Sequence, residues 1–269
     1  MNGGLPLPPI PRRKAWLLPH GAPNAPAASG VPLGPATQLN ENQQNTGKAE
    51  MKNSFGGVLF DLDGTLLDTL EDLANSMNTA LHRLGFEGHP VADYRYYVGD
   101  GTEILARRVL PPTHRNERTV EQCVEAMLAE YQKRWHEKTR PYTGVPDLLD
   151  ALMARRIPMA ILSNKKHEFT QLTVSRLLPN WQFTAVVGAK PGVPKKPDPT
   201  AALQIAADLH LQPENLLYVG DTNTDMQTAT AAGMYPVGAL WGFRTEEELR
   251  ATGAKAIIAR PQDLLPYLG

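Results

Sequence analysis

The sequence predicts an α/β fold in which helices cover both faces of a parallel sheet and an all-helical segment interrupts the chain early. Two observations indicate this. From about residue 141 onward, short apolar runs alternate with amphipathic stretches, the pattern of parallel strands joined by helical crossovers. Between about residues 68 and 140, apolar side chains recur at helical spacing and no convincing strand occurs. We therefore expect the helical segment to be inserted after the first strand of the sheet.

The first 50 residues differ in composition from the rest of the chain. Nine of them are proline, and no Asp or Glu precedes Glu41. A segment without periodic apolar residues buries too little surface to offset the entropy lost on ordering. We expect residues 1–52 to be a disordered extension or to lie upstream of the true start, for which Met51 is a candidate. An Arg-rich, acid-poor targeting peptide is the alternative.

The folded part begins with a short apolar strand, 58–60, that ends at Asp61. Thr69, with Asp72 three residues later, has the pattern of a capping box and indicates the start of a helix. The insert is then expected to contain, in order, a helix from about 70 to 84, a polar aromatic loop at 89–101, and helices at 102–110 and 117–137.

After Pro141 the expected elements alternate strictly. Helices are predicted at 146–155, 167–177, 199–209, 224–232 and 245–252, strands at 157–162, 184–187, 216–219, 235–239 and 256–259, and a last helix closes the chain. Such alternation brings the carboxyl ends of all strands to one edge of the sheet, which is the edge where open α/β sheets bind ligands.

The composition argues against several classes of function. A formal net charge of -1 and a pI near 6.7 provide no basic footprint for nucleic acid or for an anionic membrane. No run of ~18 apolar residues occurs, so we expect no transmembrane helix. Cys123 is the only cysteine, so no intrachain disulfide can form, and we interpret it as a packing residue of a cytoplasmic protein. We expect a monomer or homodimer that binds neither nucleic acid nor membrane.

Acidic residues follow two of the predicted strands. The first strand ends in Asp61 and Asp63, whose side chains share one face of an extended chain. Two carboxylates this close repel each other, so a cation or a shared proton must hold them; an acidic turn is the alternative. Strand 216–219 leads to Asp221, with Asp225 four residues later. Asp61, Asp63 and Asp221 at neighbouring strand ends suit Mg²⁺, which prefers carboxylate oxygens.

Groups suited to phosphate follow two other strands. Ser163 and Asn164 offer a hydroxyl and amide donors at a strand-to-helix junction, with a helix N-cap as the alternative. Lys196 precedes Pro197, which favours extended geometry; a phosphate clamp and a solvated loop lysine are the two interpretations. Acid, hydroxyl, amine and acid at four successive strand ends together favour a phosphate-processing site.

These motifs resemble those of phosphatases of the haloacid dehalogenase (HAD) superfamily. The matching residues are "DLDGT" at 61–65, Ser163, Lys196 and "GDTNTD" at 220–225, and the similarity covers roughly residues 56–269. The resemblance implies a Rossmann-like parallel sheet core, formed by 53–67 and 141–269, with an inserted all-helical cap domain at 68–140.

The resemblance also implies a role for each motif residue. Asp61 would be the nucleophile that forms an aspartyl-phosphate, and Asp63 the acid that protonates the leaving alcohol and then activates water. Asp225 would support the metal shell or orient Lys196, itself a third catalytic residue. Mg²⁺ would be held by Asp61, the backbone carbonyl of Asp63, and Asp221. The implied phosphate-binding residues are Thr65, Ser163, Asn164 and Lys196.

Within the superfamily, the segments "VGDG", "RPYTGV" and "LWGF" look most like those of phosphoglycolate phosphatases. The implied partner is a small phosphorylated metabolite, 2-phosphoglycolate. The usual Gly-Asn-Gly of the cap loop is Gly-Asp-Gly here, and Asp100 would repel a substrate carboxylate if it faced the site. Arg107 or Arg108 would compensate by pairing with that carboxylate; solvated helix charges are the alternative. Asp100 and Arg107 are therefore the candidate substrate-selecting residues.

Other interpretations of the same motifs stay open. A sugar-phosphate phosphatase or a β-phosphoglucomutase-like enzyme would use the same aspartyl-phosphate chemistry, and nucleoside monophosphates and pyrophosphate are further candidate substrates. A non-catalytic binding protein on the HAD fold is disfavoured, because the nucleophile and the metal-binding acids are all present.

Overall fold

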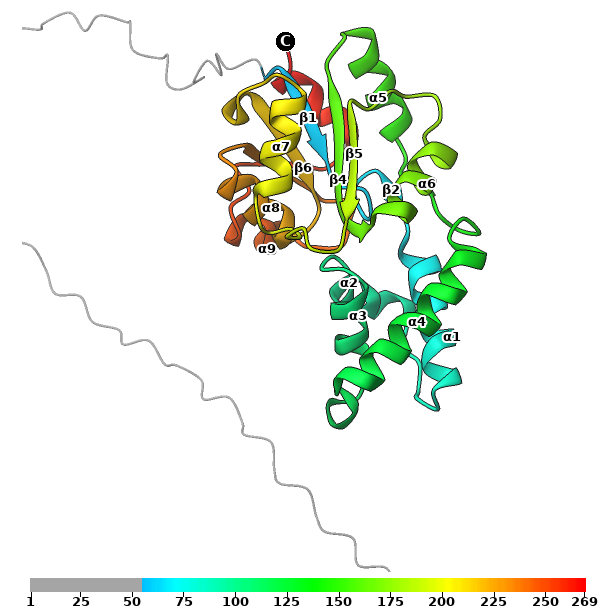
Figure 1. Cartoon of the computed structure of the whole chain (residues 1–269). Helices are drawn as coiled ribbons and strands as arrows, with labels where there is room; N and C mark the ends of the chain where they lie inside the picture. The colour runs from blue at the N-terminus through cyan, green and yellow to red at the C-terminus, as the bar shows by residue number, and fades with distance from the viewer. Residues whose placement is uncertain (1–54) are drawn as a thin grey trace, which may run out of the picture. The chain divides into compact units, whose positions relative to one another are not determined.

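A computed structural model of the chain describes residues 55–269 (Figure 1). The expectations for residues 1–52 lie outside the described residues. Across 55–269, no helix has both the length and the apolar content that crossing a membrane would require. The described part contains a parallel sheet and a helical insert, as the sequence predicts.

The core of the fold is a six-stranded parallel sheet with the strand order β5-β4-β1-β6-β7-β8. Its strands are β1 (Gly57–Phe60), β4 (Met159–Lys166), β5 (Ala185–Ala189), β6 (Leu216–Gly220), β7 (Tyr235–Ala239) and β8 (Ala256–Ile258). The chain runs outward from β1 through β4 to β5, and then crosses back to β6 on the other side of β1. The predicted α/β class is confirmed, and the ends of β1, β4 and β6 meet at the switch point where such sheets bind ligands.

Alternate residues of β1 face two different hydrophobic clusters. Val58 and Phe60 pack into one cluster and Leu59 into the other, as the period of two along a strand requires. The first cluster receives side chains from α5 (Val145–Ala154), α6 (His167–Leu177) and η4 (Pro261–Tyr267), and the second from α7 (Thr200–Asp208) and α8 (Asn223–Ala231). Helix α9 (Glu246–Ala251) packs beside β7 and α8, and η3 (Pro213–Asn215) precedes β6. Helices thus cover both faces of the sheet (Figure 1).

The insert between β1 and β4 has a hydrophobic cluster of its own. It consists of α1 (Leu70–Arg83), η1 (Val91–Asp93), α2 (Tyr94–Tyr97), α3 (Thr102–Val109), η2 (Pro112–His114) and α4 (Glu117–Arg134). Helices α1 and α4 pack against each other (Figure 1). Met77 and Leu81 of α1 and Tyr131 of α4 are buried in this cluster. The insert is the helical cap of the fold.

Some predicted elements need correction. The expected loop at 89–101 contains η1 and α2, because Tyr94 is fully buried and its hydroxyl donates to Asn78 Oδ1 at 2.7 Å. Strands β2 (Leu67–Asp68) and β3 (Arg140–Pro141) pair antiparallel where the chain enters and leaves the cap, although no strand was expected within 68–140. Two-residue strands are too short to show any periodicity.

Two more boundaries differ from expectation. Strand β4 runs to Lys166 rather than ending at 162, because Lys166 still pairs with Ala189 of β5 after a break in register. The last helix, η4, is a 3₁₀ helix; Pro266 lies within it and has no backbone N–H to donate.

The predicted capping box at the start of α1 is wrong. The Thr69 side chain caps nothing, and its buried hydroxyl has no hydrogen-bond partner among the described residues. Asp72 instead accepts from Lys138 N at 3.0 and 3.1 Å, and from Thr139 N and Oγ1 at 2.8 and 2.7 Å. The carboxylate therefore joins the segment that enters the cap to the segment that leaves it.

We expect Asp72→Asn to lower the free energy of unfolding by about 2–3 kcal/mol, because an amide NH₂ would face donors that need an acceptor. Urea denaturation of the full chain measures the loss. The matched control is Glu71→Gln, since Glu71 is exposed and 3.9 Å from Lys138. The control should change stability by less than about 0.5 kcal/mol. Equal effects of the two substitutions would contradict the role assigned to Asp72.

The interpretation of Cys123 as a packing residue is confirmed. Its side chain is fully buried, its Sγ lies 3.5 Å from Met77 Sδ, and burial raises the pKa of the thiol to about 11. Because thiolate is the reactive form, we expect almost no reaction with a disulfide reagent at pH 8 in the native protein and one thiol per chain after denaturation. Rapid release of one equivalent from the native protein would contradict this burial.

Candidate active site

The first acidic motif forms a tight loop at the end of β1. Asp61 follows Phe60, donates its backbone N–H to Val219 O at 2.9 Å, and is buried. Gly64 has φ +90°, and a Cβ at this position would come within 2.3 Å of Asp221 Oδ2. A side chain cannot be placed there, so glycine is what allows the loop to approach the end of β6 closely.

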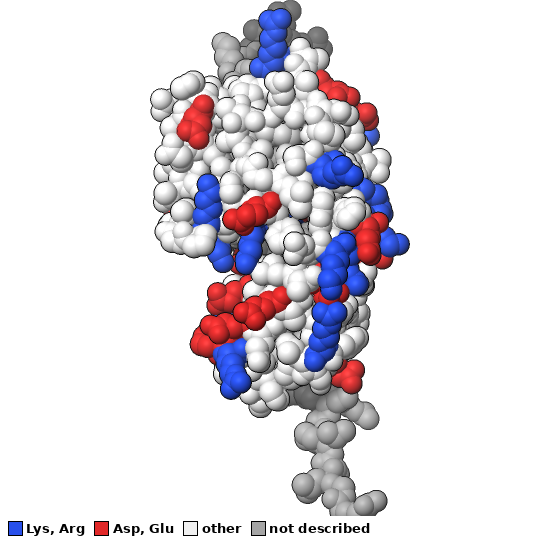
Figure 2. Space-filling model, turned by 45° about the vertical axis from the view of Figure 1, so that its right-hand side comes forward, with Lys and Arg blue, Asp and Glu red and all other residues white. Residues whose placement is uncertain are grey.

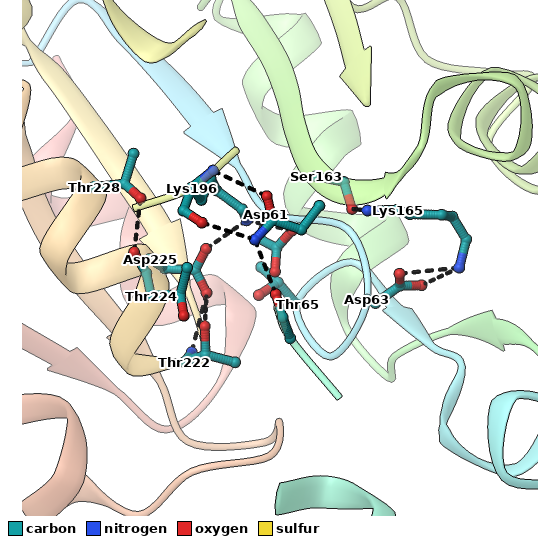
Figure 3. A network of polar contacts seen from close by, with 12 residues as sticks. Asp61, Asp63, Thr65, Ser163, Lys165, Lys196, Thr222, Thr224, Asp225 and Thr228 are labelled. Carbon is teal, nitrogen blue, oxygen red and sulfur yellow. Dashed lines mark hydrogen bonds and ion pairs between the residues drawn. The ribbon is translucent and has the colours of Figure 1, made fainter. Parts of the chain in front are cut away.

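Lys196 links the acidic groups of the site. Its Nζ lies 2.8 Å from Asp61 Oδ1 and 2.7 Å from Asp225 Oδ1, and its side chain is only 2% exposed (Figure 3). Asn164 fixes the lysine backbone in both directions: Lys196 N donates to Asn164 Oδ1, and Asn164 Nδ2 donates to Lys196 O. Burial opposes the charged form of Lys196, but Asp225 and Asp61 outweigh it and raise its pKa well above the ordinary value.

Asp61, Asp221 and Asp225 form a buried acidic cluster in which one carboxylate oxygen of each lies within 4.8 Å of the others. Burial and the neighbouring carboxylates raise the pKa of Asp61 well above its usual range, and burial with Asp225 raises that of Asp221 to about 7. Lys196 brings one positive charge against three carboxylates. The cluster is therefore short of positive charge and offers hard oxygen donors, a donor set that fits Mg²⁺.

The cluster differs in one member from the expected metal set of Asp61, Asp63 and Asp221. Asp225 takes part, and the Asp63 carboxylate lies elsewhere, bonded to Lys165. The implied ligand from Asp63 is its backbone carbonyl, and that assignment stays a prediction.

Asp225 also organises the start of α8. Thr222 donates to Asp225 Oδ2 from its N at 3.1 Å and from its Oγ1 at 2.6 Å, which forms a capping box (Figure 3). The other carboxylate oxygen, Oδ1, holds Lys196. Of the two roles implied for Asp225, orienting Lys196 is thus a direct contact in the structure.

The loop after β7 supports Asp221. Thr65 Oγ1 donates to Asp221 Oδ1 at 2.7 Å, and Phe243 N donates to Asp221 Oδ2 at 2.8 Å. Trp241 Nε1 donates to Thr65 O at 2.9 Å. The Thr65 hydroxyl is therefore bonded to Asp221 inside the protein, and Thr65 does not line the pocket, so its implied contact with phosphate has no support in the geometry. The "LWGF" segment works as a support for the acidic cluster.

Ser163 and Asn164 lie on β4 and do not cap α6. The helix begins at His167, and neither residue is its N-cap, so the alternative interpretation as a helix cap is wrong. Both are buried and line the pocket beside Asp61. Ser163 Oγ accepts from Lys165 N at 3.2 Å, and Asn164 Nδ2 reaches Gly99 O of the cap at 3.1 Å.

The sequence reasoning missed Lys165. Its Nζ lies 2.9 Å from both carboxylate oxygens of Asp63 (Figure 3). The same Nζ lies 4.8 Å from the ring centroid of Tyr131. Its side chain is 6% exposed. Burial disfavours the charged form, but Asp63 outweighs it and raises the pKa of Lys165 above its ordinary value. The sequence carries one indication of this residue. Lys165 is two positions after Ser163, and side chains two apart on a strand lie on the same face of the sheet.

The cap loop with the sequence Gly-Asp-Gly is bonded to the core. Thr224 Oγ1 donates to Asp100 Oδ1 at 2.6 Å, and Arg108 pairs with Asp100 Oδ2. Arg244 of the core donates to the backbone carbonyls of Arg95 and Val98. Both carboxylate oxygens of Asp100 are therefore engaged by protein groups, and Asp100 lies outside the pocket lining.

Arg107 lies apart from the pocket. It is paired with Glu103 at 3.1 Å and with Glu117 at 2.6 Å in an exposed ion-pair cluster. Of the two adjacent arginines, Arg108 is the one that contacts Asp100. The geometry thus offers no support for Asp100 and Arg107 as substrate-selecting residues.

A small pocket lies between the core and the cap. It has a volume of about 50 Å³, whereas sites for drug-sized ligands typically have roughly 300–1,000 Å³. Its polar side comes largely from the core, and its apolar side comes largely from the cap. The polar lining consists of Asp61, Asp63, Ser163, Asn164, Lys165 and Lys166 of the core with Thr102 and Tyr131 of the cap, and the apolar lining of Leu73, Val98, Leu105, Met127, Leu128 and Phe169.

A wider groove opens next to this pocket, and its walls carry opposite charges. The cap wall carries four glutamates, Glu103, Glu117, Glu121 and Glu125, and the core wall carries three lysines and one glutamate, Lys166, Lys190, Lys195 and Glu168. On the face of the molecule in Figure 2, acidic and basic side chains are interspersed and form no extended basic patch. The attraction between the two walls favours the approach of cap and core.

The arrangement can transfer a phosphoryl group. A buried carboxylate held by a lysine, a second carboxylate beside it, and hydroxyl and amide donors all border one pocket. These are the groups that covalent phosphoryl transfer requires: a nucleophile, a proton donor and donors that offset charge on the phosphoryl oxygens.

Comparison with known proteins agrees with this geometry. A sequence model of the haloacid dehalogenase-like hydrolase family matches residues 58–239, and the chain belongs to this family. This confirms the predicted HAD superfamily phosphatase, a phosphoric monoester hydrolase.

Within this family, the chain is similar to proteins named phosphoglycolate phosphatases. A phosphoglycolate phosphatase of Aquifex aeolicus is 33% identical over 211 residues, which cover 78% of this chain and 95% of the relative. A phosphoglycolate phosphatase of Pseudomonas putida is 32% identical over 78% of each chain. A solved structure, described as a predicted phosphoglycolate phosphatase from Haemophilus somnus 129PT, superimposes with a TM-score of 0.73 at 25% identity and covers 79% of this chain and 97% of its own.

We expect Asp100→Ala to lower kcat/KM about tenfold, and by a similar factor for a carboxylate-bearing and for a neutral phosphate ester. The substitution removes two bonds that hold the cap loop, at roughly 0.5–1.5 kcal/mol each, and removes no contact with substrate. Asp100→Asn keeps an acceptor for Thr224 and should lie between Ala and the wild type. Arg107→Gln is the control and should leave both rates nearly unchanged. A change confined to the carboxylate-bearing ester would instead support a substrate-facing Asp100.

Proposed function

We propose that this enzyme is a Mg²⁺-dependent phosphomonoester hydrolase that acts through an aspartyl-phosphate intermediate, and that its substrate is 2-phosphoglycolate. The observation that carries the proposal is the buried Asp61, held by Lys196 within a three-carboxylate cluster that borders a small pocket. The single cysteine, which allows no intrachain disulfide, fits a cytoplasmic enzyme.

In the first step, a carboxylate oxygen of Asp61 attacks the phosphorus atom. A bond forms between that oxygen and phosphorus while the bond from phosphorus to the ester oxygen breaks. Asp63, in its protonated form, gives its proton to the departing oxygen, so glycolate leaves with a neutral hydroxyl group. Lys196 keeps Asp61 in position throughout, because it contacts Oδ1 at 2.8 Å.

In the second step, water attacks the phosphorus atom of the aspartyl-phosphate. Asp63, now a carboxylate, takes a proton from that water as the new bond forms. The bond between phosphorus and Asp61 then breaks, which releases inorganic phosphate and restores both carboxyl groups to their starting forms. One residue serves as acid and then as base, so the cycle needs no outside proton carrier.

Charge on the phosphoryl oxygens is offset from two directions. Ser163 borders the pocket on the β4 side, and Lys196 supplies positive charge from the loop after β5. Asn164 also borders the pocket, and its side-chain amide holds Lys196 O and Gly99 O. Mg²⁺, held by Asp61, the Asp63 carbonyl and Asp221, would add positive charge at the same oxygens. The apolar side chains of the cap keep bulk water out of the pocket.

Pocket size supports a small leaving group. A volume of about 50 Å³ beneath apolar cap side chains suits a two-carbon acid better than a sugar ring. By leaving-group size, this pocket favours 2-phosphoglycolate over larger sugar phosphates and over the sugar bisphosphate of a β-phosphoglucomutase-like enzyme. The relatives named as phosphoglycolate phosphatases support the same substrate.

The decisive experiment measures phosphate release from 2-phosphoglycolate with Mg²⁺ by the wild type and by Asp61→Asn. The substitution removes the nucleophile, so we expect kcat to fall at least about 1,000-fold. The control, Asp147→Asn, changes an exposed acid of α5 and should behave as the wild type. EDTA should abolish turnover and added Mg²⁺ should restore it.

Two results would contradict the proposal. Full activity of Asp61→Asn would exclude the covalent route. Faster phosphate release from hexose phosphates, nucleoside monophosphates or pyrophosphate than from 2-phosphoglycolate would reject the substrate assignment and leave the hydrolase assignment intact.

A further inference from the structure

Lys165 is a buried cation in the pocket that the proposed chemistry does not use. It is contributed by β4, two residues beyond Ser163, and its side chain is 6% exposed. A buried ammonium group must be paired, and its partner here is Asp63, with both oxygens at 2.9 Å. An ammonium group has three N–H donors, so two contacts with Asp63 leave one donor free.

The position of Asp63 shows what this free donor can reach. To protonate the ester oxygen, Asp63 must come within hydrogen-bonding distance of it, roughly 2.6–3.2 Å. The leaving group therefore lies next to Asp63, and also next to Lys165. In a two-carbon leaving group, the carboxylate oxygens lie roughly 2.7–3.6 Å from the ester oxygen, given ordinary bond lengths and angles. That distance places a carboxylate within reach of the lysine.

Apart from Lys165, the pocket offers a negative charge one other cation, the exposed Lys166, and its remaining side chains are mostly apolar. Leu73, Leu105, Met127 and Phe169 supply apolar surface there. A carboxylate buried against them without a partner would lose several kcal/mol of hydration free energy. One further polar group is at hand: the buried hydroxyl of Tyr131 has no hydrogen-bond partner among residues 55–269, and the ring of Tyr131 lies 4.8 Å below the lysine ammonium.

We propose that Lys165 is the specificity-determining residue for the leaving group and binds the carboxylate of an acidic phosphate ester. The inference rests on the proposed phosphatase function, since it takes the position of the leaving group from the role of Asp63. It moves substrate selection from the cap loop, where Asp100 and Arg107 lie, to β4 of the core.

The test compares two esters of nearly equal shape, 2-phosphoglycolate and 2-hydroxyethyl phosphate, which differ in whether a carboxylate or a hydroxymethyl group follows the first carbon. The readout is the ratio of their kcat/KM values with Mg²⁺. For Lys165→Met, which keeps length and removes charge, we expect this ratio to fall on the order of 100-fold, the typical effect of losing a charge-assisted hydrogen bond. Lys165→Arg keeps the charge and should retain most of the preference.

Loss of the contact with Asp63 would slow both esters alike, so the ratio separates the two roles of Lys165. An unchanged ratio in Lys165→Met, with both rates lowered, would show that Lys165 only positions Asp63 and would overturn the inference. Lys166→Met is the matched control, because the neighbouring lysine is exposed and also borders the pocket. If Lys166→Met lowered the ratio by the same factor, the preference for the carboxylate-bearing ester would come from positive charge near the pocket in general and not from Lys165. That result would also overturn the inference.

Two further controls keep the result interpretable. If a thermal melt shows that Lys165→Met does not fold, Lys165→Gln replaces it, because glutamine removes the charge but keeps an N–H donor for Asp63. The same fall in the ratio of kcat/KM values is expected for Lys165→Gln. A wild type that hydrolyses both esters at similar rates overturns the inference and leaves the phosphatase function intact. A wild type that hydrolyses neither ester rejects the proposed function and the inference with it.

Discussion

Three carboxylates and one ammonium group meet at the carboxyl edge of the sheet, and the loops of the site are built around that contact. Lys196 reaches Asp61 and Asp225 at once, within 2.8 Å of each. Buried charges are tolerated only when they are paired and hydrogen-bonded. The loops after β1, β5 and β6 must therefore converge within hydrogen-bonding distance, and glycine allows this where a side chain would collide. In the loop after β1, for example, a Cβ at Gly64 would lie 2.3 Å from Asp221 Oδ2, and in the loop after β7 a Cβ at Gly242 would lie 2.3 Å from Asp221 Cβ.

The core and the cap contribute different kinds of side chain to the pocket. The core supplies all the charged groups of the pocket, at or near the ends of strands, while the cap supplies most of its apolar surface. Asn164 connects the two parts, because its side chain holds the backbone of Lys196 on one side and of Gly99 on the other. The cap is thus bonded, through Asn164, to the loop that carries Lys196.

The sheet and the acidic motifs could be predicted because their signals are local: a short apolar run followed by Asp, Ser or Lys is visible within ten residues. Lys165 could not be found in this way, since its significance depends on a contact with Asp63, 102 positions earlier. The same limit explains the false capping box, because the true partners of Asp72 are Lys138 and Thr139. Arg107 and Arg108 are adjacent on α3, and only the rotation of the helix, about 100° per residue, decides which one meets Asp100.

The first turn of α8 contacts both the active-site lysine Lys196 and the cap loop. Thr222 and Asp225 cap the helix and steer Lys196, while Thr224, between them, holds Asp100 of the cap loop. Two parts of the chain that are more than a hundred residues apart are therefore joined by a direct side-chain contact. A cap loop grafted from a relative would lose its contact with the core unless the first turn of α8 were grafted with it. A chimera that exchanges the cap should therefore also exchange residues 222–225 of the core.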